Sequence, residues 1–229
     1  DNYSSSGSEI FQRLMKAVLF DMDGTLIDSE PLWLESEKEV MAELGYEWSI
    51  EDQANCLGGP AEKTESYMQA RANKPMPSGY FMHELGKRMY EKLRTKLNLI
   101  DGAVELVTAV RNSGCKTALV TASPSILMSA ALQKLPAELF DATVSCDDVP
   151  RSKPDPAPYL LAAKLIDVSI SDCIVVEDSL TGITSGLAAG AKVIGIPNIQ
   201  TLAPNKRLLQ VKNLKEIDLT LLKNWWAGN

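Results

Sequence analysis

Short apolar runs alternate with longer amphipathic stretches through much of the sequence, and this alternation limits the possible folds more than any other feature. The apolar runs, each of the length of a buried strand, are residues 16–20, 116–120, 142–145, 173–176 and 192–196. The amphipathic stretches, each with helical spacing, are residues 104–112, 125–135, 156–166 and 180–190. Strands that alternate with helices are joined by right-handed crossovers and therefore run parallel. The sequence thus predicts an α/β fold with a doubly wound, Rossmann-like parallel sheet.

A long helical insert separates the first apolar run from the second. A helix is expected over residues 29–45, where Ser29 or Asp28 is a suitable N-cap and Gly45 a suitable end. Further amphipathic stretches cover residues 61–72 and 81–97, and Gly- and Pro-rich segments interrupt them. No buried strand is expected in this insert, which indicates a small helical domain.

The expected division into domains follows from this insert. The α/β core comprises residues 15–30 and 98–229, and the helical domain comprises residues 31–97. The segments near residues 27–31 and 97–102 join the two parts, and we expect them to act as hinges.

Composition restricts the classes of partner. A net charge of −7 opposes general binding to nucleic acid or to a membrane surface, because both need basic patches. The four cysteines lack the C-x-x-C spacing of zinc sites and fit free thiols in a reducing cytosol. We expect a cytoplasmic monomer that acts on a small molecule. Residues 1–14 are rich in serine and have no apolar core, so a mobile extension is predicted there.

Polar side chains gather at the ends of the predicted strands. They are Asp21 and Asp23 after the first strand, Thr121, Ala122 and Ser123 after the second, Glu177 and Asp178 after a later one, and Lys153 before the helix at 156–166. Parallel strands bring their carboxyl ends to one edge of the sheet, which is where α/β proteins bind ligands. We therefore expect these side chains to lie close together.

Taken alone, Asp21-Met22-Asp23-Gly24 admits three interpretations. It can be a solvated turn, a calcium loop, or a magnesium site for phosphoryl chemistry. The calcium loop fits poorly, because Gly24 stands at the fourth position, whereas the EF-hand loop has its glycine at the sixth. The choice between the other two depends on the rest of the chain.

The strand-end residues together fit phosphoryl transfer. Mg²⁺ takes oxygen ligands, and Asp21, Asp178 and the backbone carbonyl of Asp23 can supply them. Thr121 can donate a hydrogen bond to a phosphate oxygen, and Lys153 can neutralise both a carboxylate and the transferring group. The helix that starts after Ser123-Pro124 should add free N–H groups that favour an anion.

Four stretches in this order resemble the four motifs of the haloacid dehalogenase-like hydrolases. They are Asp21-Met22-Asp23-Gly24-Thr25, Val120-Thr121-Ala122-Ser123, Lys153-Pro154-Asp155-Pro156 and Val176-Glu177-Asp178-Ser179. The helical insert resembles the small helical cap of that superfamily, and the likeness covers residues 15–200. The subgroup that the chain resembles contains β-phosphoglucomutase and bacterial sugar-phosphate phosphatases.

The resemblance implies a role for each motif residue. Asp21 would attack phosphorus and form an aspartyl-phosphate, and Asp23 would act first as acid and then as base. The substrate's phosphoryl group would be held by Thr121, Ala122, Ser123 and Lys153. The Mg²⁺ ligands would be Asp21, Asp23 and Asp178, with Glu177 as a direct ligand or as support for one.

The resemblance leaves more than one activity open. Asp23 opposes the dehalogenase branch, which lacks this second aspartate. The phosphomutase branch has a cap histidine and a cap arginine at the positions that we align with Trp33 and Glu62. We therefore expect a phosphatase that acts on a small metabolite such as a sugar phosphate. A sugar phosphomutase and a catalytically silent binding protein are the alternatives.

Overall fold

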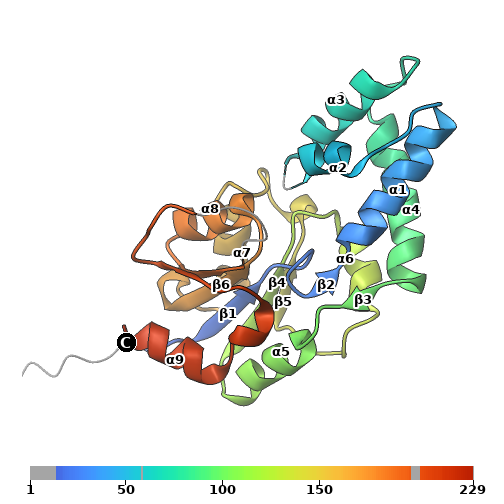
Figure 1. Ribbon diagram of the computed structural model, residues 1–229. Helices are drawn as coiled ribbons and strands as arrows, with labels where there is room; N and C mark the ends of the chain where they lie inside the picture. The colour runs from blue at the N-terminus through green and yellow to red at the C-terminus, as the bar shows by residue number, and fades with distance from the viewer. Residues whose placement is uncertain (1–13, 58, 197–201, 229) are drawn as a thin grey trace, which may run out of the picture.

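The computed structural model describes residues 14–57, 59–196 and 202–228, and its centre is a six-stranded sheet (Figure 1). The strand order is β5-β4-β1-β6-β7-β8, and every neighbouring pair is parallel. The strands are β1 (Ala17–Phe20), β4 (Lys116–Val120), β5 (Ala142–Val144), β6 (Cys173–Glu177), β7 (Lys192–Gly195) and β8 (Leu208–Gln210). The predicted doubly wound parallel sheet is confirmed.

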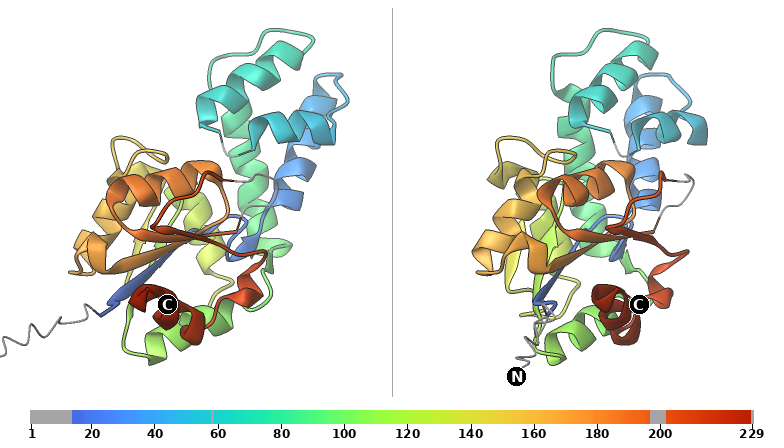
Figure 2. Two further views of the ribbon diagram at one scale, coloured as in Figure 1. Left: turned by 60° about the vertical axis from the view of Figure 1, so that its left-hand side comes forward. Right: turned by 90° about the vertical axis from the view of Figure 1, so that its left-hand side faces the viewer.

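The central strands are apolar along their whole length because the sheet is covered on both faces. All four residues of β1 are fully buried. One face is covered by α7 (Ala157–Leu165) and α8 (Leu180–Ala189), and the other by α5 (Ala103–Asn112), α6 (Ser125–Leu132) and α9 (Leu219–Ala227) (Figure 2). The consecutive apolar run of β1, without polar alternation, is the pattern of a strand buried on both faces.

The predicted helical insert consists of four helices, α1 (Glu30–Glu43), α2 (Ile50–Cys56), α3 (Ala61–Arg71) and α4 (Tyr80–Thr95). They enclose an apolar cluster of their own, made of Val40, Met41, Leu44, Trp48, Cys56, Met68, Phe81 and Leu85. The sequence analysis did not predict α2. It begins with a capping box in which Ser49 and Asp52 exchange hydrogen bonds between side chain and backbone.

Two short strands join the helical insert to the core. β2 (Ile27–Asp28) and β3 (Asn98–Leu99) pair antiparallel, so the two segments predicted as hinges lie side by side. The carboxyl-terminal half of α4 also packs on the core, since Met89 and Leu93 share an apolar cluster with Leu127 of α6. The boundary in side-chain packing between the helical insert and the core therefore does not coincide with the sequence boundary expected at residue 97. The domain limits and the hinge motion stay predictions.

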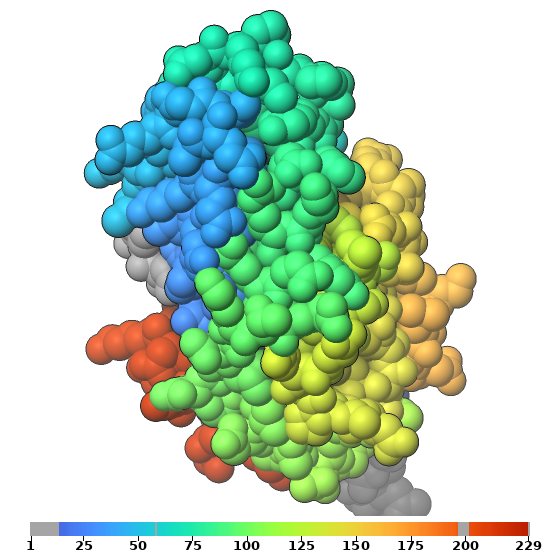
Figure 3. All heavy atoms as spheres, turned by 90° about the vertical axis from the view of Figure 1, so that its right-hand side faces the viewer, coloured from blue at the N-terminus to red at the C-terminus, as the bar shows by residue number. Residues whose placement is uncertain are grey.

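A ladder of ion pairs connects α1 with α4, which run side by side on one face of the molecule (Figure 3). Its three shortest contacts are Glu43 Oε1 to Arg88 Nη2 at 2.6 Å, Glu39 Oε1 to Lys92 Nζ at 2.8 Å, and Glu35 Oε1 to Lys96 Nζ at 2.7 Å. The partners recur every four residues on both helices, because that spacing returns each side chain to the same helix face.

Several smaller predictions can be checked on the described residues. Cys56, Cys115, Cys146 and Cys173 are free thiols. Trp225 and Trp226 of α9 pack partly buried against the core. Within the described ranges, no helix has the length and apolar character needed to cross a membrane. The predicted extension at residues 1–14 falls, apart from Leu14, outside the described residues.

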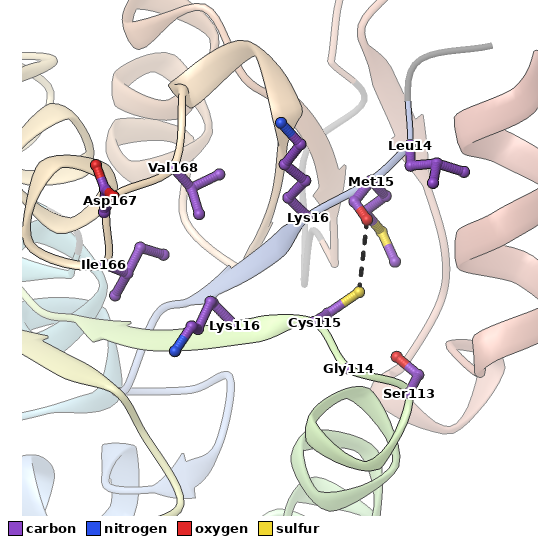
Figure 4. Close-up of a pocket in the computed structure, with 10 residues that line it drawn as sticks. All are labelled: Leu14, Met15, Lys16, Ser113, Gly114, Cys115, Lys116, Ile166, Asp167 and Val168. Atoms are coloured by element: carbon purple, nitrogen blue, oxygen red, sulfur yellow. Dashed lines mark hydrogen bonds between the residues drawn. The ribbon is translucent and has the colours of Figure 1, made fainter. Parts of the chain in front are cut away.

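A cavity of about 620 Å³ opens at the amino-terminal edge of the sheet (Figure 4). Lys16 and Lys116 stand at the starts of β1 and β4, and Cys115 donates from its thiol to the carbonyl of Met15. None of the polar residues predicted for the site lines this cavity. The predicted site residues lie at the opposite edge, beyond the carboxyl ends of the same strands.

Candidate active site

Strand register brings the predicted site residues to one level of the sheet. Phe20 at the end of β1 pairs with Leu119 of β4 and with Val176 of β6. Asp21, Thr121 and Asp178 each follow directly on the last residue of one of these three strands. They therefore converge at the carboxyl edge, on both sides of the central strand.

Lys153 is the cation at the centre of this edge. Its ammonium donates three hydrogen bonds: to Asp21 Oδ1 at 2.7 Å, to Glu177 Oε1 at 2.6 Å, and to the Val120 carbonyl at 2.8 Å. Its side chain is only 2% exposed. Burial by itself would lower the pKa of Lys153, but the carboxylates of Asp21 and Glu177 outweigh that effect and raise the pKa above its usual value.

Asp21 is held between this lysine and a hydroxyl. Lys153 donates to Oδ1, and Thr25 Oγ1 donates to Oδ2 at 3.0 Å. Burial, reinforced by the nearby carboxylate of Glu177, raises the pKa of Asp21 to about 7. Asp178 is raised further, to a pKa of about 9, by burial and by the charges of Asp21 and Glu177. The two aspartates thus share a crowded, dry, negatively charged space.

This crowding fits a divalent cation. One oxygen from each of Asp21, Glu177 and Asp178 lies within 4.8 Å of the others. Carboxylate oxygens are the donors that Mg²⁺ prefers. The raised pKa values of Asp21 and Asp178 arise from burial and from repulsion among the acids, and a cation between them would relieve that repulsion. The residues present therefore fit the predicted metal.

Glu177 is fully buried, and both of its carboxylate oxygens already accept hydrogen bonds. Oε1 accepts from Lys153 Nζ and from Tyr159 OH, at 2.6 and 2.7 Å. Oε2 accepts from the N–H groups of Asp178 and Ser179 and from the Ser179 hydroxyl. The alternative between a direct ligand and a supporting residue stays open for Glu177, but its hydrogen bonds favour support.

Asp23 lies apart from the metal cluster and is surrounded by hydroxyl groups. Ser29 Oγ donates to Oδ1 at 2.7 Å, while Thr121 Oγ1 and Ser123 Oγ donate to Oδ2 at 3.1 and 2.9 Å. Ser29 is the N-cap residue of α1, as the sequence suggested, but its hydroxyl makes no capping bond and donates to Asp23 instead.

The helix N-terminus after Ser123 differs from the expectation. Asp147, in the turn Cys146–Asp148, accepts from both the N–H and the hydroxyl of Ser125 at 2.8 Å. The Ser123 N–H donates to Thr121 Oγ1. The carboxylate of Asp147 thus takes up the N–H of Ser125, the first residue of α6, so this N–H is not among the free groups expected there.

Two glycines allow the carboxylates to approach the backbone. Gly24 has a φ of +79°, and a β-carbon there would overlap Oδ2 of Asp178. A β-carbon at Gly182, in the first turn of α8, would overlap the carboxylate of Glu177. Larger residues at either position would displace a member of the acidic cluster.

Sequence reasoning missed several members of this arrangement. Thr25 lies inside a quoted motif without an assigned role, and Ser29 was considered only as an N-cap candidate. Tyr159 follows Lys153 by six residues and is the third residue of α7. A buried tyrosine in an otherwise apolar helix face was the available signal, because its hydroxyl needs a partner. Asp147 gave no signal in the sequence alone.

Comparisons with known proteins agree with these motifs. The family model described as haloacid dehalogenase-like hydrolase matches residues 18–196. Hexitol phosphatase B of Escherichia coli O157:H7 is 32% identical over 213 residues, which cover 92% of this chain and 95% of that protein. The chloroplastic protein SUPPRESSOR OF QUENCHING 1 of Arabidopsis thaliana is 34% identical over 192 residues, 80% of this chain, but the match spans only 18% of that protein's length.

Solved structures share the fold. A hydrolase of the same superfamily from Entamoeba histolytica HM-1:IMSS, described as family IA, variant 3, superposes with a TM-score of 0.79 at 30% identity. The superposition covers 94% of this chain and 100% of that one. The likeness therefore includes the helical insert as well as the α/β core.

Proposed function

The chain belongs to the haloacid dehalogenase-like hydrolases and is a phosphatase, and we propose that it hydrolyses a small phosphorylated carbohydrate with Mg²⁺ through an aspartyl-phosphate. One observation carries the proposal. A buried lysine, hydrogen-bonded to Asp21, stands beside a cluster of carboxylates that fits a cation, and Asp23 lies on the other side, held by hydroxyls. This arrangement supports the proposal that a nucleophile, a positive charge and an acid–base group act on one phosphorus atom.

In the first step, a carboxylate oxygen of Asp21 attacks phosphorus and forms the acyl-phosphate bond. The bond from phosphorus to the ester oxygen breaks, and protonated Asp23 gives its proton to that oxygen. Lys153 orients Asp21 through the 2.7 Å hydrogen bond to Oδ1 and neutralises charge on the transferring group. Thr121, the Ala122 N–H and Ser123 bind the phosphoryl oxygens.

In the second step, water attacks the phosphorus of the aspartyl-phosphate. Asp23, now ionised, takes a proton from that water, and the bond between phosphorus and Asp21 breaks to release inorganic phosphate. The Ser29 hydroxyl holds Asp23 Oδ1 for both transfers, while the hydroxyls of Thr121 and Ser123 hold Oδ2 until they turn to the phosphoryl oxygens. The enzyme returns to its starting protonation state.

The ion would be held by Asp21, Asp178 and the backbone carbonyl of Asp23, with Glu177 as support. When bound, Mg²⁺ supplies positive charge that favours ionised Asp21 and offsets the charge of the phosphoryl group. The buried setting of these acids makes that charge effective, because little water screens it.

Two observations favour hydrolysis over the phosphomutase reaction. Cations of the helical insert are largely engaged inside it: Arg71 pairs with Asp52, and Arg88 and Lys92 pair with glutamates of α1. Trp33 and Glu62 stand where we align a histidine and an arginine of the phosphomutase branch, and Trp33 packs into the insert's apolar cluster. A second, distal phosphate would find few free partners. A cytoplasmic location and a monomeric state stay predictions.

A substrate panel tests this proposal. Hexitol, hexose and pentose monophosphates are incubated with and without Mg²⁺, and released phosphate is measured. We expect Mg²⁺-dependent release, with at least one carbohydrate ester preferred over p-nitrophenyl phosphate. Absence of release from every ester would contradict phosphatase activity. Conversion of glucose 1-phosphate to glucose 6-phosphate with a bisphosphate primer would establish the phosphomutase alternative instead.

A further inference from the structure

Lys153 has no hydrogen-bond donor left for a substrate in the structure. An ammonium group has three N–H bonds, and those of Lys153 point to Asp21, Glu177 and the Val120 carbonyl. Binding a phosphoryl oxygen therefore requires that one of these acceptors be given up. The bond to Asp21 orients the nucleophile, so the donor must come from Glu177 or from Val120.

Glu177 Oε1 differs from the other acceptors because a second donor already reaches it. Tyr159 OH donates to this same oxygen at 2.7 Å. Tyr159 is fully buried in α7, with its ring 5.1 Å from the Lys153 ammonium. A phenol has one O–H donor, and that of Tyr159 is directed at Oε1.

We propose that Tyr159 is a positioning residue whose hydroxyl holds Glu177 Oε1, so that Lys153 can turn one N–H from Glu177 to the phosphoryl group. This inference rests on the proposed function. Without the hydroxyl, the departure of Lys153 would leave a fully buried, charged oxygen with no donor, which is unfavourable. With it, Oε1 keeps one hydrogen bond throughout, and Oε2 keeps its bonds to the backbone and to Ser179.

The Val120 carbonyl is a poorer source of the donor. Among the side-chain, loop and turn hydrogen bonds of the described residues, Lys153 is the one donor to this carbonyl, so none of those bonds would hold it after Lys153 leaves. The other oxygen of Glu177, Oε2, accepts from three donors, so the carboxylate is held in place when Lys153 moves. The structure therefore favours Glu177, and not the Val120 carbonyl, as the acceptor that Lys153 gives up when it binds a phosphoryl oxygen.

The test compares Y159F with the parent enzyme at saturating Mg²⁺. We expect kcat/KM to fall about tenfold and the Kd of inorganic phosphate, measured by calorimetry, to rise by a similar factor. The Kd of Mg²⁺ should change less than threefold, since Tyr159 touches no proposed ligand except Glu177. Y67F is the matched control, because Tyr67 OH likewise donates to a carboxylate, Asp52, but in the helical insert. It should leave both constants unchanged.

A double-mutant cycle separates positioning from a general effect on the fold. In the E177Q background residue 177 carries no charge that the Tyr159 hydroxyl must stabilise. Y159F should then change phosphate affinity less than twofold. Equal effects of Y159F in both backgrounds, or parental kcat/KM and phosphate affinity in Y159F itself, would overturn the inference and leave the proposed function standing. A parent protein that neither hydrolyses esters nor binds phosphate would overturn both.

Discussion

Two ion clusters of this protein use the same kinds of charged groups in opposite surroundings. At the carboxyl edge of the sheet, the side chains of Lys153, Asp21 and Glu177 are 2%, 8% and 0% exposed. Along α1 and α4, the acidic members of the ladder, Glu35, Glu39 and Glu43, are 40%, 42% and 57% exposed. The N–O distances in the two clusters are nearly the same.

The surroundings, and not the number of contacts, decide what each cluster does. In the buried cluster the pKa of Asp21 rises to about 7, because burial opposes its ionised form. In the ladder the hydrogen bond from Lys96 only lowers the pKa of Glu35, and water screens the remaining charges. Burial of both partners therefore raises the pKa of the acid in the first cluster, whereas the acids of the ladder, which stay exposed, keep a low pKa where the shift is resolved, as in Glu35.

The largest expected effect tests the chemistry of the buried cluster. D21N removes the proposed nucleophile, and we expect turnover to fall by ~1,000-fold or more. The fold should survive, because the amide relieves repulsion from Glu177 and Asp178. Phosphate release and thermal unfolding are measured together. Near-parental turnover in D21N would rule out the covalent mechanism.

Removing the buried cation tests how much Lys153 contributes to the stability of the folded protein. K153M keeps the side-chain stem but leaves Asp21 and Glu177 without their positive partner, which should lower the free energy of unfolding by about 3–5 kcal/mol. Urea denaturation at neutral pH measures the change. A loss below about 1 kcal/mol would show that the two clusters contribute alike and that burial is not the deciding variable.

A buried acid in the helical insert gives an intermediate case. Glu37 is 4% exposed and accepts from Trp48 Nε1 at 2.9 Å, and burial raises its pKa from 4.5 to about 7. The folded state therefore binds more protons than the unfolded state between these values, so its stability should fall as pH rises from about 4.5 to 7.

Glu37→Gln checks this sign, since the amide oxygen can still accept from Trp48. We expect E37Q to be more stable than the parent by about 1–2 kcal/mol at pH 8, and equal to it near pH 4. Denaturation curves across pH measure the difference. Stabilisation that is independent of pH would mean that the charge of Glu37 is not its origin.

The smallest effect is expected on the ladder. K96M makes the same substitution as K153M at a lysine that is 55% exposed, and it should leave the urea midpoint close to that of the parent. Any small difference between K96M and its parent should also shrink in 1 M NaCl, whereas that of K153M should persist. A salt-insensitive destabilisation of K96M as large as that of K153M would contradict the comparison.

The sequence was sufficient to predict that the central residues of the site lie together, because parallel strands end at the same edge of a sheet. Asp21, Thr121 and Asp178 directly follow apolar runs, and parallel pairing places such positions at one edge whatever the details of packing. The pair β2–β3 and the edge strand β8 were not predicted, because strands of two or three residues carry too few residues to show a pattern.

The sequence by itself determined the parallel sheet, the helical insert and the set of charged residues at the sheet edge, since periodicity and strand ends are local properties of the chain. Only the tertiary structure decided how those charges are shared. The Ser29 hydroxyl donates to Asp23 and not to its own helix, Asp147 caps α6, and the Tyr159 hydroxyl donates to Glu177. Each contact depends on the direction of a side chain across separate elements. A hydrogen bond of 2.7 Å requires sub-ångström placement, which residue spacing along the chain does not specify.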